Sequence, residues 1–443
     1  MDNLSFADMT KRNLENAITF ITDRRAEYVH NPDADFTRER KLNMRDTISL
    51  LLSMDGGSLA KELHKHFEHR NASITPSALV QQRSKIKSAA FYDLLRQFNQ
   101  TEVVRQKYKG YRILAVDSSA INQPRDPDLD SFMCTSQFPH GLNQTQMSVM
   151  YDVLNKTVLD VDLRPRPKMD ETGAFVSMLQ RNTFSEKNIM IMDRGYESYN
   201  VFAHLMEKEN VDFLCRVKNQ KSMREIGKLP MEELDRDISF EITTTQTNED
   251  KEKQRVYFQT ARKRGKSYSK KTPIRKWDHV SPYTMKFRVV RFQLNTGDYE
   301  TLVTTLPRFI FSVQDIKELY HRRWGIETAF RDIKYSLGLI NLHSKKEDLV
   351  MQEIYAALIV YNFCTRIVSA VVVEKRQQAI HAYQVNFKMA VYLCKNFYRR
   401  IASMGPDLMI EIGQYTEAIR PGRQDQRKLR PKGFAGFIYR VAA

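Results

Sequence analysis

The chain has 443 residues, a formal net charge of +17 at pH 7 and a pI of about 9.5. This length exceeds that of one small domain and is typical of two or three domains, each with a core of its own. So large a positive excess favours a polyanionic partner, nucleic acid first of all, over a basic surface that serves only solubility.

The four cysteines are Cys134, Cys215, Cys364 and Cys394, and they are widely separated. They show neither the spacing of metal ligands nor that of a disulfide framework. Proteins of a reducing compartment use cysteine in this way. We therefore expect a cytoplasmic protein.

One apolar stretch, residues 354–373, is long enough to cross a bilayer. Asn362, Thr365 and Arg366 lie in its middle, where a charge is costly in lipid. At the N-terminus, acids stand where a signal peptide would carry bases, and no apolar segment follows. We expect a buried helix in this stretch, and no membrane partner.

Residues 1–105 are expected to be helical, with runs at 38–54, 58–67 and 75–86. Thr75 is the expected N-cap of the third run, and Pro76 its first helical residue. Two helices joined by a turn are similar to a helix-turn-helix DNA-binding unit, although any small helical bundle gives the same pattern. The side chains expected to contact DNA are Gln81, Gln82, Arg83 and Lys85.

From Tyr111 onward, strands and helices alternate. An apolar run ends at Asp117, and two β-rich runs within 146–165 are joined by a hairpin at Asn155 and Lys156. A helix over 170–182, a second apolar run that ends in an acid, another helix and another strand follow. This order predicts a mixed α/β sheet.

The pattern changes again between residues 220 and 307, where alternating, basic, β-rich segments predict an insertion in the α/β domain. Residues 262–276 form a cationic loop within it. Beyond Pro307 the chain is expected to be helical as far as Arg400, and a basic tail with interspersed aromatic residues follows.

Two acids are expected at strand ends. Asp117 and Asp193 each end an apolar run, and a carboxylate there emerges at the edge of the sheet, where α/β sheets bind their ligands. The alternative is that each of them caps the turn or helix that follows. Other acids close to the same sheet remain candidates: Asp152, Asp160 and Asp162.

A third acid, Glu327, belongs to a stretch expected to form one continuous helix over 320–334. At 100° per residue, a narrow polar stripe runs beside a core-facing apolar stripe. Tyr320, Arg323, Glu327 and Lys334 make up this polar stripe. An ordinary ion pair of Glu327 with Arg323 or Arg331 is the alternative.

Three converging carboxylates would repel one another unless a cation lay between them. Magnesium suits such a site, because it binds a few carboxylates and keeps water for a phosphate substrate. Two such ions about 4 Å apart hold both oxygens of a phosphodiester displacement. Arg323 and Lys334 are then expected to bind phosphates, and Tyr320 to pack on or hydrogen-bond to the DNA backbone.

The four polar residues spell Y-x2-R-x3-E-x6-K, and the chain thereby resembles the IS-four family of bacterial insertion-sequence transposases. Residues 115–122 (AVDSSAIN) and 193–196 (DRGY) are similar to that family's two other acidic motifs. The resemblance covers about residues 35 to 440. It implies an RNase-H-like α/β fold with a β-rich insertion. It also implies a catalytic, metal-binding triad of Asp117, Asp193 and Glu327, for two magnesium ions or for manganese.

The domain organisation expected from the pattern and the resemblance has four parts. They are a helical, helix-turn-helix-like DNA-binding domain (1–105), the RNase-H-like catalytic domain (106–219 and 308–350), the β-strand insertion domain (220–307) and a helical C-terminal region with a basic tail (351–443).

The resemblance further implies an enzyme that cleaves and joins double-stranded DNA at the inverted repeats of its own element, through a hairpin intermediate. Such an enzyme acts on transposon ends and target DNA as a homodimer in a synaptic complex, associated with the nucleoid. Hairpins need an aromatic side chain against an unstacked base. Tyr299 is the favoured candidate, Trp277 the second, and Trp324 also lies beside the polar stripe.

Two other functions remain open. One is a catalytically silent, domesticated relative that binds DNA, and the presence of all three acids and the whole signature argues against it. The other is a nuclease that does not join the cut ends.

Overall fold

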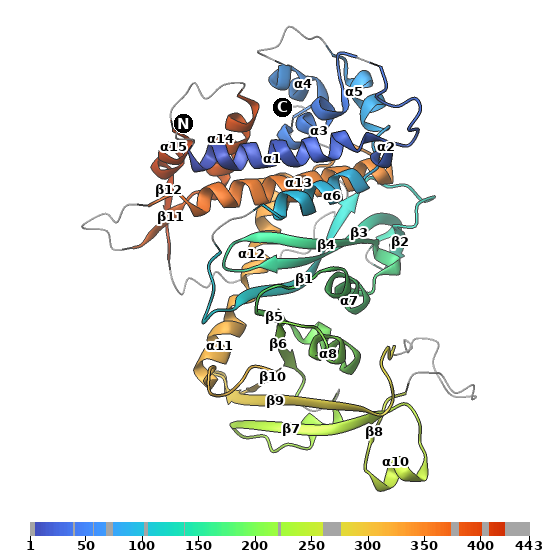
Figure 1. The fold of residues 1–443 in the computed structure, drawn as a ribbon, viewed down its shortest axis with the longest axis vertical. Helices are drawn as coiled ribbons and strands as arrows, with labels where there is room; N and C mark the ends of the chain where they lie inside the picture. The colour runs from blue at the N-terminus through green and yellow to red at the C-terminus, as the bar shows by residue number, and fades with distance from the viewer. Residues whose placement is uncertain are drawn as a thin grey trace. The chain divides into compact units, whose positions relative to one another are not determined.

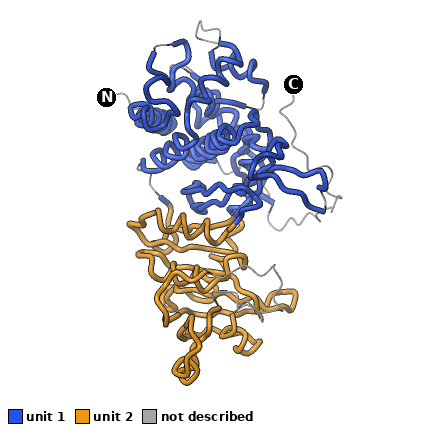
Figure 2. Tube along the Cα trace, turned by 90° about the vertical axis from the view of Figure 1, so that its right-hand side faces the viewer, with its two compact units in different colours: residues 1–105, 118–169, 325–443 blue, residues 106–117, 170–324 orange. Residues whose placement is uncertain are grey.

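The computed structural model divides into two compact units, coloured separately in Figure 2. Unit 1 comprises residues 1–105, 118–169 and 325–443, and unit 2 comprises residues 106–117 and 170–324. The structure describes residues 5–38, 40–55, 57–67, 74–101, 105–136, 138–219, 223–259, 276–373, 381–400 and 407–420.

Unit 1 is largely helical, and its centre is the long helix α13 (Glu347–Ser369). Most of this helix is buried, because α1, α3, α6 and α14 pack around it (Figure 1). The burial confirms the prediction for the apolar stretch at 354–373. The described residues contain no helix that is both long and apolar enough to cross a bilayer.

The remaining helices of unit 1 are shorter than α13. They are α1 (Phe6–Asp23), α2 (Arg25–Tyr28), α3 (Met44–Ser53), α4 (Leu59–Phe67), α5 (Pro76–Arg83), α6 (Ala89–Asn99), α12 (Gly325–Arg331), the π-helix η3 (Asp332–Ser336), α14 (Phe387–Arg399) and α15 (Leu408–Gln414). The Thr75 hydroxyl accepts a hydrogen bond from the Ala78 N–H at 3.2 Å, and Pro76 opens α5. Both features of this helix start were predicted.

The β-hairpin of unit 1 was also predicted. β3 (Phe138–Asp152) and β4 (Thr157–Pro165) pair antiparallel, and Lys156 closes the turn with a φ of 49°. The short strand β2 (Phe132–Thr135) pairs with the other side of β3. A small two-stranded sheet of β11 (Tyr383–Val385) and β12 (Thr416–Ala418) and the turn η1 (Arg166–Lys168) complete the unit.

Unit 2 is built on a mixed sheet in the strand order β1-β5-β6-β10-β9-β7-β8. The strands are β1 (Arg112–Gln123, of which residues 112–117 lie in this unit), β5 (Asn188–Met192), β6 (Val211–Val217), β7 (Leu234–Thr243), β8 (Val256–Tyr257), β9 (Tyr283–Gln293) and β10 (Tyr299–Thr304). β1, β5 and β6 run parallel, and β10 pairs antiparallel with β6. The strands of 220–307 therefore extend the sheet itself, and the predicted mixed α/β class is confirmed.

The helices of unit 2 are α7 (Glu171–Arg181), η2 (Arg194–Tyr196), α8 (Tyr199–Met206), α9 (Arg224–Gly227), α10 (Asn248–Glu252) and α11 (Val313–Arg322). α7 begins where the sequence predicts, because the Asp170 carboxylate accepts the Gly173 N–H at 2.9 Å. All five residues of β5 are buried, as is usual for a parallel strand covered on both faces.

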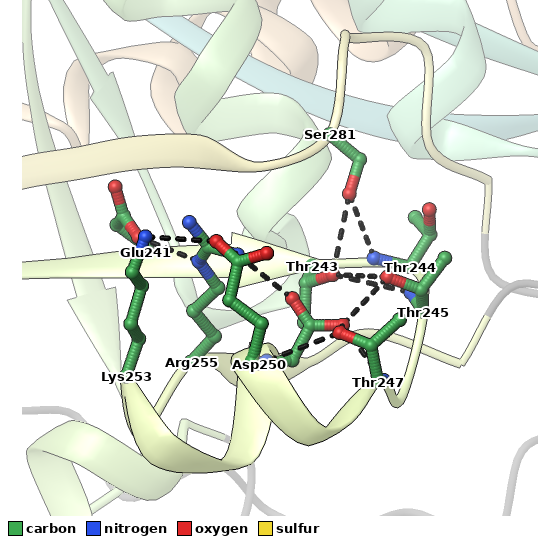
Figure 3. Close-up of polar contacts among 10 residues, drawn as sticks. Glu241, Thr243, Thr244, Thr245, Thr247, Asp250, Lys253, Arg255 and Ser281 are labelled. Carbon is green, nitrogen blue, oxygen red and sulfur yellow. Dashed lines mark hydrogen bonds and ion pairs between the residues drawn. The ribbon is translucent and has the colours of Figure 1, made fainter.

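The far end of the sheet is held by a polar network between β7, α10 and β8 (Figure 3). The Asp250 carboxylate accepts hydrogen bonds from the Thr245 hydroxyl at 2.7 Å and from the Thr247 N–H at 2.9 Å. Arg255 bridges Asp250 at 3.0 Å to Glu241 at 2.7 Å. The hydrogen bonds from threonine and arginine keep the pKa of Asp250 well below its usual range.

Arg83, expected to contact DNA, is instead buried. Its guanidinium lies 3.0 Å from a Glu353 carboxylate oxygen and donates to the Leu349 carbonyl at 2.8 Å and to the Gln352 amide oxygen at 3.3 Å. The side chain is 1% exposed. The DNA-contacting role expected for Arg83 is therefore wrong, because α13 supplies it with a buried anionic partner.

Candidate active site

Asp117 and Asp193 are brought together by strand register. Val116 of β1 and Met192 of β5 are partners in the parallel pairing, and each aspartate is the next residue on its strand. Neighbouring strands lie about 4.8 Å apart, and residues at matching positions point to the same face of a sheet. Two half-buried carboxylates thus emerge side by side where the parallel pairing of β1 and β5 ends.

β1 does not end at Asp117, as the sequence suggested, but continues to Gln123. Only its parallel pairing with β5 ends there. The residues that follow are therefore strand, and the alternative that Asp117 caps a turn is wrong. Arg323 Nη1 lies 3.8 Å from an Asp117 carboxylate oxygen, and both side chains are mostly buried, at 8% and 27% exposed.

Asp193 directly follows the last residue of β5, at the end of the predicted apolar run, and caps the 3₁₀ turn η2. Its Oδ1 accepts a hydrogen bond from the Gly195 N–H at 2.8 Å, which holds the carboxylate next to the end of the β1–β5 pairing. Behind it, the Cys215 thiol donates to the Asp193 carbonyl at 3.4 Å. Burial, with Glu197 and Asp193 close by, raises the pKa of Cys215 well above its ordinary value.

A polar cluster borders the two aspartates in unit 2. Arg216 of β6 lies 3.3 Å from the Glu300 carboxylate of β10. Burial raises the pKa of Glu300, and Arg216 and Arg323 oppose that rise. Burial also raises the pKa of Tyr320, which lies in the field of the same two arginines. Sequence analysis missed Glu300 and Arg216, because only strand register brings them to this place.

The other two signature residues lie in unit 1. Glu327 is half-buried on α12. Lys334 lies in the π-helix η3, and its ammonium donates to the Ala120 carbonyl of β1 at 2.8 Å. Burial lowers the pKa of Lys334. Both side chains therefore belong to a partly enclosed polar environment.

The expected single helix over 320–334 is wrong. α11 ends at Arg322 in a tight turn, where the Arg323 N–H donates to the Tyr320 carbonyl at 3.1 Å. α12 then begins at Gly325, and the backbone widens into a π-helix at Asp332. A constant 100° per residue does not hold across two such changes, so helical periodicity does not place the four polar residues on one stripe. π-turns are frequent at functional sites.

The three alternative acids have structural partners in unit 1. Asp152 accepts the Asn155 N–H at 2.9 Å and thereby holds the hairpin turn. Asp160 is fully buried and accepts the Tyr92 hydroxyl at 3.0 Å. Asp162 pairs with Arg164 at 2.6 Å. These contacts explain all three residues without catalysis.

The aromatic candidates differ in their surroundings. Trp277 packs among Phe258, His279 and Tyr283, with ring centroids 5.3 to 5.5 Å away. Tyr299 is half-buried at the start of β10. Trp324 is 51% exposed, and the Arg323 guanidinium lies 5.0 Å from its ring centroid. Residues 262–275 of the cationic loop and residues 421–443 of the basic tail lie outside the described residues.

The chemistry of this donor set suits a divalent metal. Carboxylate oxygens are the ligands that magnesium and manganese prefer. Among the described residues, no three His, Cys, Asp or Glu side chains lie close enough together to hold a metal ion. The paired aspartates are thus the part of such a site that unit 2 assembles by itself.

Comparison with known proteins defines the class. Residues 108–363, more than half of the chain, match the family described as Transposase DDE domain. The chain belongs to this family, which confirms the insertion-sequence transposase class expected from the sequence. Its members depend on divalent metals.

Curated relatives match over shorter stretches. "Transposase for insertion sequence element IS421" from Escherichia coli is 33% identical over 20% of this chain and 24% of its own length. "Probable transposase for insertion sequence element IS5377" from Geobacillus stearothermophilus is 35% identical over 18% of this chain and 20% of its own length. The chain thus matches between a fifth and a quarter of the length of these relatives.

One solved structure, a cryo-EM structure of the piggyBac transposase synaptic complex with hairpin DNA, is also similar. It aligns with a TM-score of 0.47 at 10% sequence identity, over 97% of this chain and 89% of that chain.

Proposed function

We propose that the chain is a DDE transposase that cleaves and joins DNA at the terminal inverted repeats of its own insertion sequence. The register that puts Asp117 beside Asp193 carries this proposal, because it places two ionisable carboxylates at one sheet edge. Such an edge is where α/β sheets take their ligands. An RNase-H-like catalytic fold agrees with the three parallel strands and the helices α7 and α8 of unit 2.

In this proposal Asp117, Asp193 and Glu327 hold the divalent ions. Two bound magnesium ions, or manganese, supply Lewis-acid stabilisation to the attacking and leaving phosphodiester oxygens. Arg323 lies beside Asp117 and offers its guanidinium to a non-bridging phosphate oxygen.

The remaining signature residues serve the DNA. Lys334 binds phosphate as a point charge, and Tyr320 contacts the backbone beside Arg323. Glu300 holds Arg216 against the same cluster. Tyr299, with Trp277 as the alternative, supports an unstacked base during a hairpin step.

The wider proposal covers organisation and partners. Residues 1–105 serve DNA binding, 106–219 and 308–350 catalysis, 220–307 the β insertion, and 351–443 the C-terminal region. The partners are transposon ends and target DNA, with a homodimer in the synaptic complex near the nucleoid. The charge of +17 supports a DNA partner.

A cleavage assay tests the proposal. The full chain is incubated with linear DNA that carries its gene and native flanks, with magnesium or with chelator. Asp117→Asn, Asp193→Asn and Glu327→Gln are each expected to remove magnesium-dependent cuts at the element ends and to retain DNA binding. Glu318→Gln, an exposed acid on α11, is the matched control and is expected to cut like wild type.

The outcomes separate the alternatives. Binding without cuts in the wild-type chain would favour the catalytically silent relative. Cuts without joining of the cleaved end to a target plasmid would favour a nuclease. If Glu327→Gln cut as fast as wild type, the assignment of the triad would be wrong.

A further inference from the structure

The π-helix η3, which contains the signature residue Lys334, borders a hollow of about 620 Å³ in unit 1. Tyr335 and Ser336 of η3 form one side of it, and α14 supplies Lys388, Tyr392 and Lys395. This volume lies within the range of about 300–1,000 Å³ typical of small-ligand sites. All residues that line the hollow belong to unit 1.

Two aromatic rings in this hollow are unusually open to solvent. Tyr335 is 64% exposed and Tyr392 is 54% exposed, whereas Tyr151 and Tyr361, also in unit 1, are each 2% exposed. Tyr335 directly follows Lys334, whose ammonium turns inward to the Ala120 carbonyl. Exposed rings at the edge of a hollow offer faces on which a planar ligand can stack.

The electrostatics of the hollow favour an anion. Its one lining acid, Asp55, contacts three cations: Arg399 at 2.7 Å, Lys65 at 3.2 Å and Lys395 at 3.4 Å. These contacts lower the pKa of Asp55 although burial opposes ionisation. Lys388 adds a fourth base, and it lies in the first turn of α14, where the helix dipole is positive. Two basic residues, Lys388 and Lys395, and one acid, Asp55, therefore line the hollow, and the acid is already paired with cations.

We propose that this hollow binds an unpaired nucleotide of a DNA strand, with a base against Tyr335 or Tyr392 and the adjoining phosphate near Lys388. Proteins recognise single-stranded DNA with aromatic side chains that stack on nucleobases and with nearby basic side chains that contact phosphates. A base within a duplex has no free face to offer them. The site deepens the proposed function, since it gives the transposase a second contact with strands opened during cleavage.

Fluorescence anisotropy with a labelled single-stranded oligothymidylate, and with a duplex of equal length, tests this site. All variants are made in the full chain carrying Glu327→Gln, so that no DNA is cut. Tyr335→Ala with Tyr392→Ala is expected to raise the Kd for the single strand about ten-fold, and that for the duplex much less. The double Tyr→Phe variant is expected to bind like its parent, because it keeps both rings. Tyr257→Ala, 41% exposed on β8 of unit 2, is the control.

Lys388→Ala provides a second test that leaves both rings in place. It is expected to reduce the slope of log K against log salt by about 1, as the loss of one phosphate contact does. The proposal is overturned if the double alanine variant matches Tyr257→Ala, or if alanine and phenylalanine weaken binding equally. It is also overturned if the alanine variant changes the molar mass in light scattering with its Kd intact, since the hollow would then be an interface between copies.

The two proposals fail separately. Suppose that wild type never cuts DNA but that the double alanine variant binds the single-stranded oligonucleotide more weakly. The transposase assignment would then be wrong, and the nucleotide site would be supported. If end cleavage depends on Glu327 while the tyrosine variants bind normally, the reverse holds.

Discussion

Arg323 lies 3.8 Å from Asp117, although its position in the sequence aligns it with Glu327. The break between α11 and α12 allows this, because Arg323 belongs to the turn and not to the helix of Glu327. The arginine therefore serves the first acid of the expected triad.

Arg323→Ala is expected to reduce single-turnover DNA cleavage by about 100-fold, as the loss of one preorganised donor does. Arg323→Lys is expected to recover only part of the rate, because an ammonium cannot replace a planar guanidinium. Arg322→Ala, its exposed neighbour, is the control. Equal cleavage by Arg323→Ala and Arg322→Ala would remove Arg323 from the site.

Glu300→Gln is expected to slow cleavage yet to stabilise the fold near neutral pH. Burial raises the pKa of Glu300, so the folded chain loses stability as pH rises through that pKa, and a glutamine does not. The gain in the free energy of unfolding should thus grow with pH and vanish below the pKa of an unfolded glutamate. Urea unfolding at several pH values measures it, with the exposed Glu232→Gln as control. A gain that is constant with pH would contradict this account.

Glu353→Gln is expected to destabilise the chain by about 3 kcal/mol at neutral pH, because it leaves Arg83 charged and buried. Burial opposes the ionisation of Glu353, but Arg83 and His343 outweigh it and lower the pKa to about 2 from 4.5. The stabilisation is present above pH 4.5 and is lost as pH falls toward 2. Urea unfolding of both proteins should therefore show a difference that shrinks below pH 4.5. A difference that persists in acid would point to packing instead.

Trp277→Ala and Tyr299→Ala are expected to separate a structural aromatic from a DNA-contacting one. Trp277 packs against three rings, and its truncation should cost about 3 kcal/mol of unfolding free energy. Tyr299→Ala should change stability little but reduce the yield of hairpin ends on denaturing gels, and Tyr299→Phe should restore it. A normal hairpin yield in Tyr299→Ala would show that Tyr299 is not the aromatic residue that supports the unstacked base.

Local features of the fold were predictable from the sequence. The cap at Thr75, the helix predicted over 170–182 and the hairpin closed by Lys156 depend on neighbouring residues alone, and all three are present. The ends of the apolar runs also marked Asp117 and Asp193 before the strand register was known.

Features that depend on long-range contacts were missed. Arg83 looked like a surface base because Glu353, its partner, lies 270 residues further along the chain. Glu300 and Arg216 meet only through the pairing of β10 with β6. The prediction over 320–334 used one constant angle per residue. Such an angle cannot show where the backbone widens into a π-turn.

The burial of Arg83 against α13 has a consequence for protein engineering. The first hundred residues share their hydrophobic core with a helix that begins at Glu347, since α1, α3 and α6 all pack on α13. A fragment cut after residue 105 would expose that shared surface and separate Arg83 from its counter-ion. Chimeras that exchange the N-terminal helices between relatives should therefore transplant these helices together with α13.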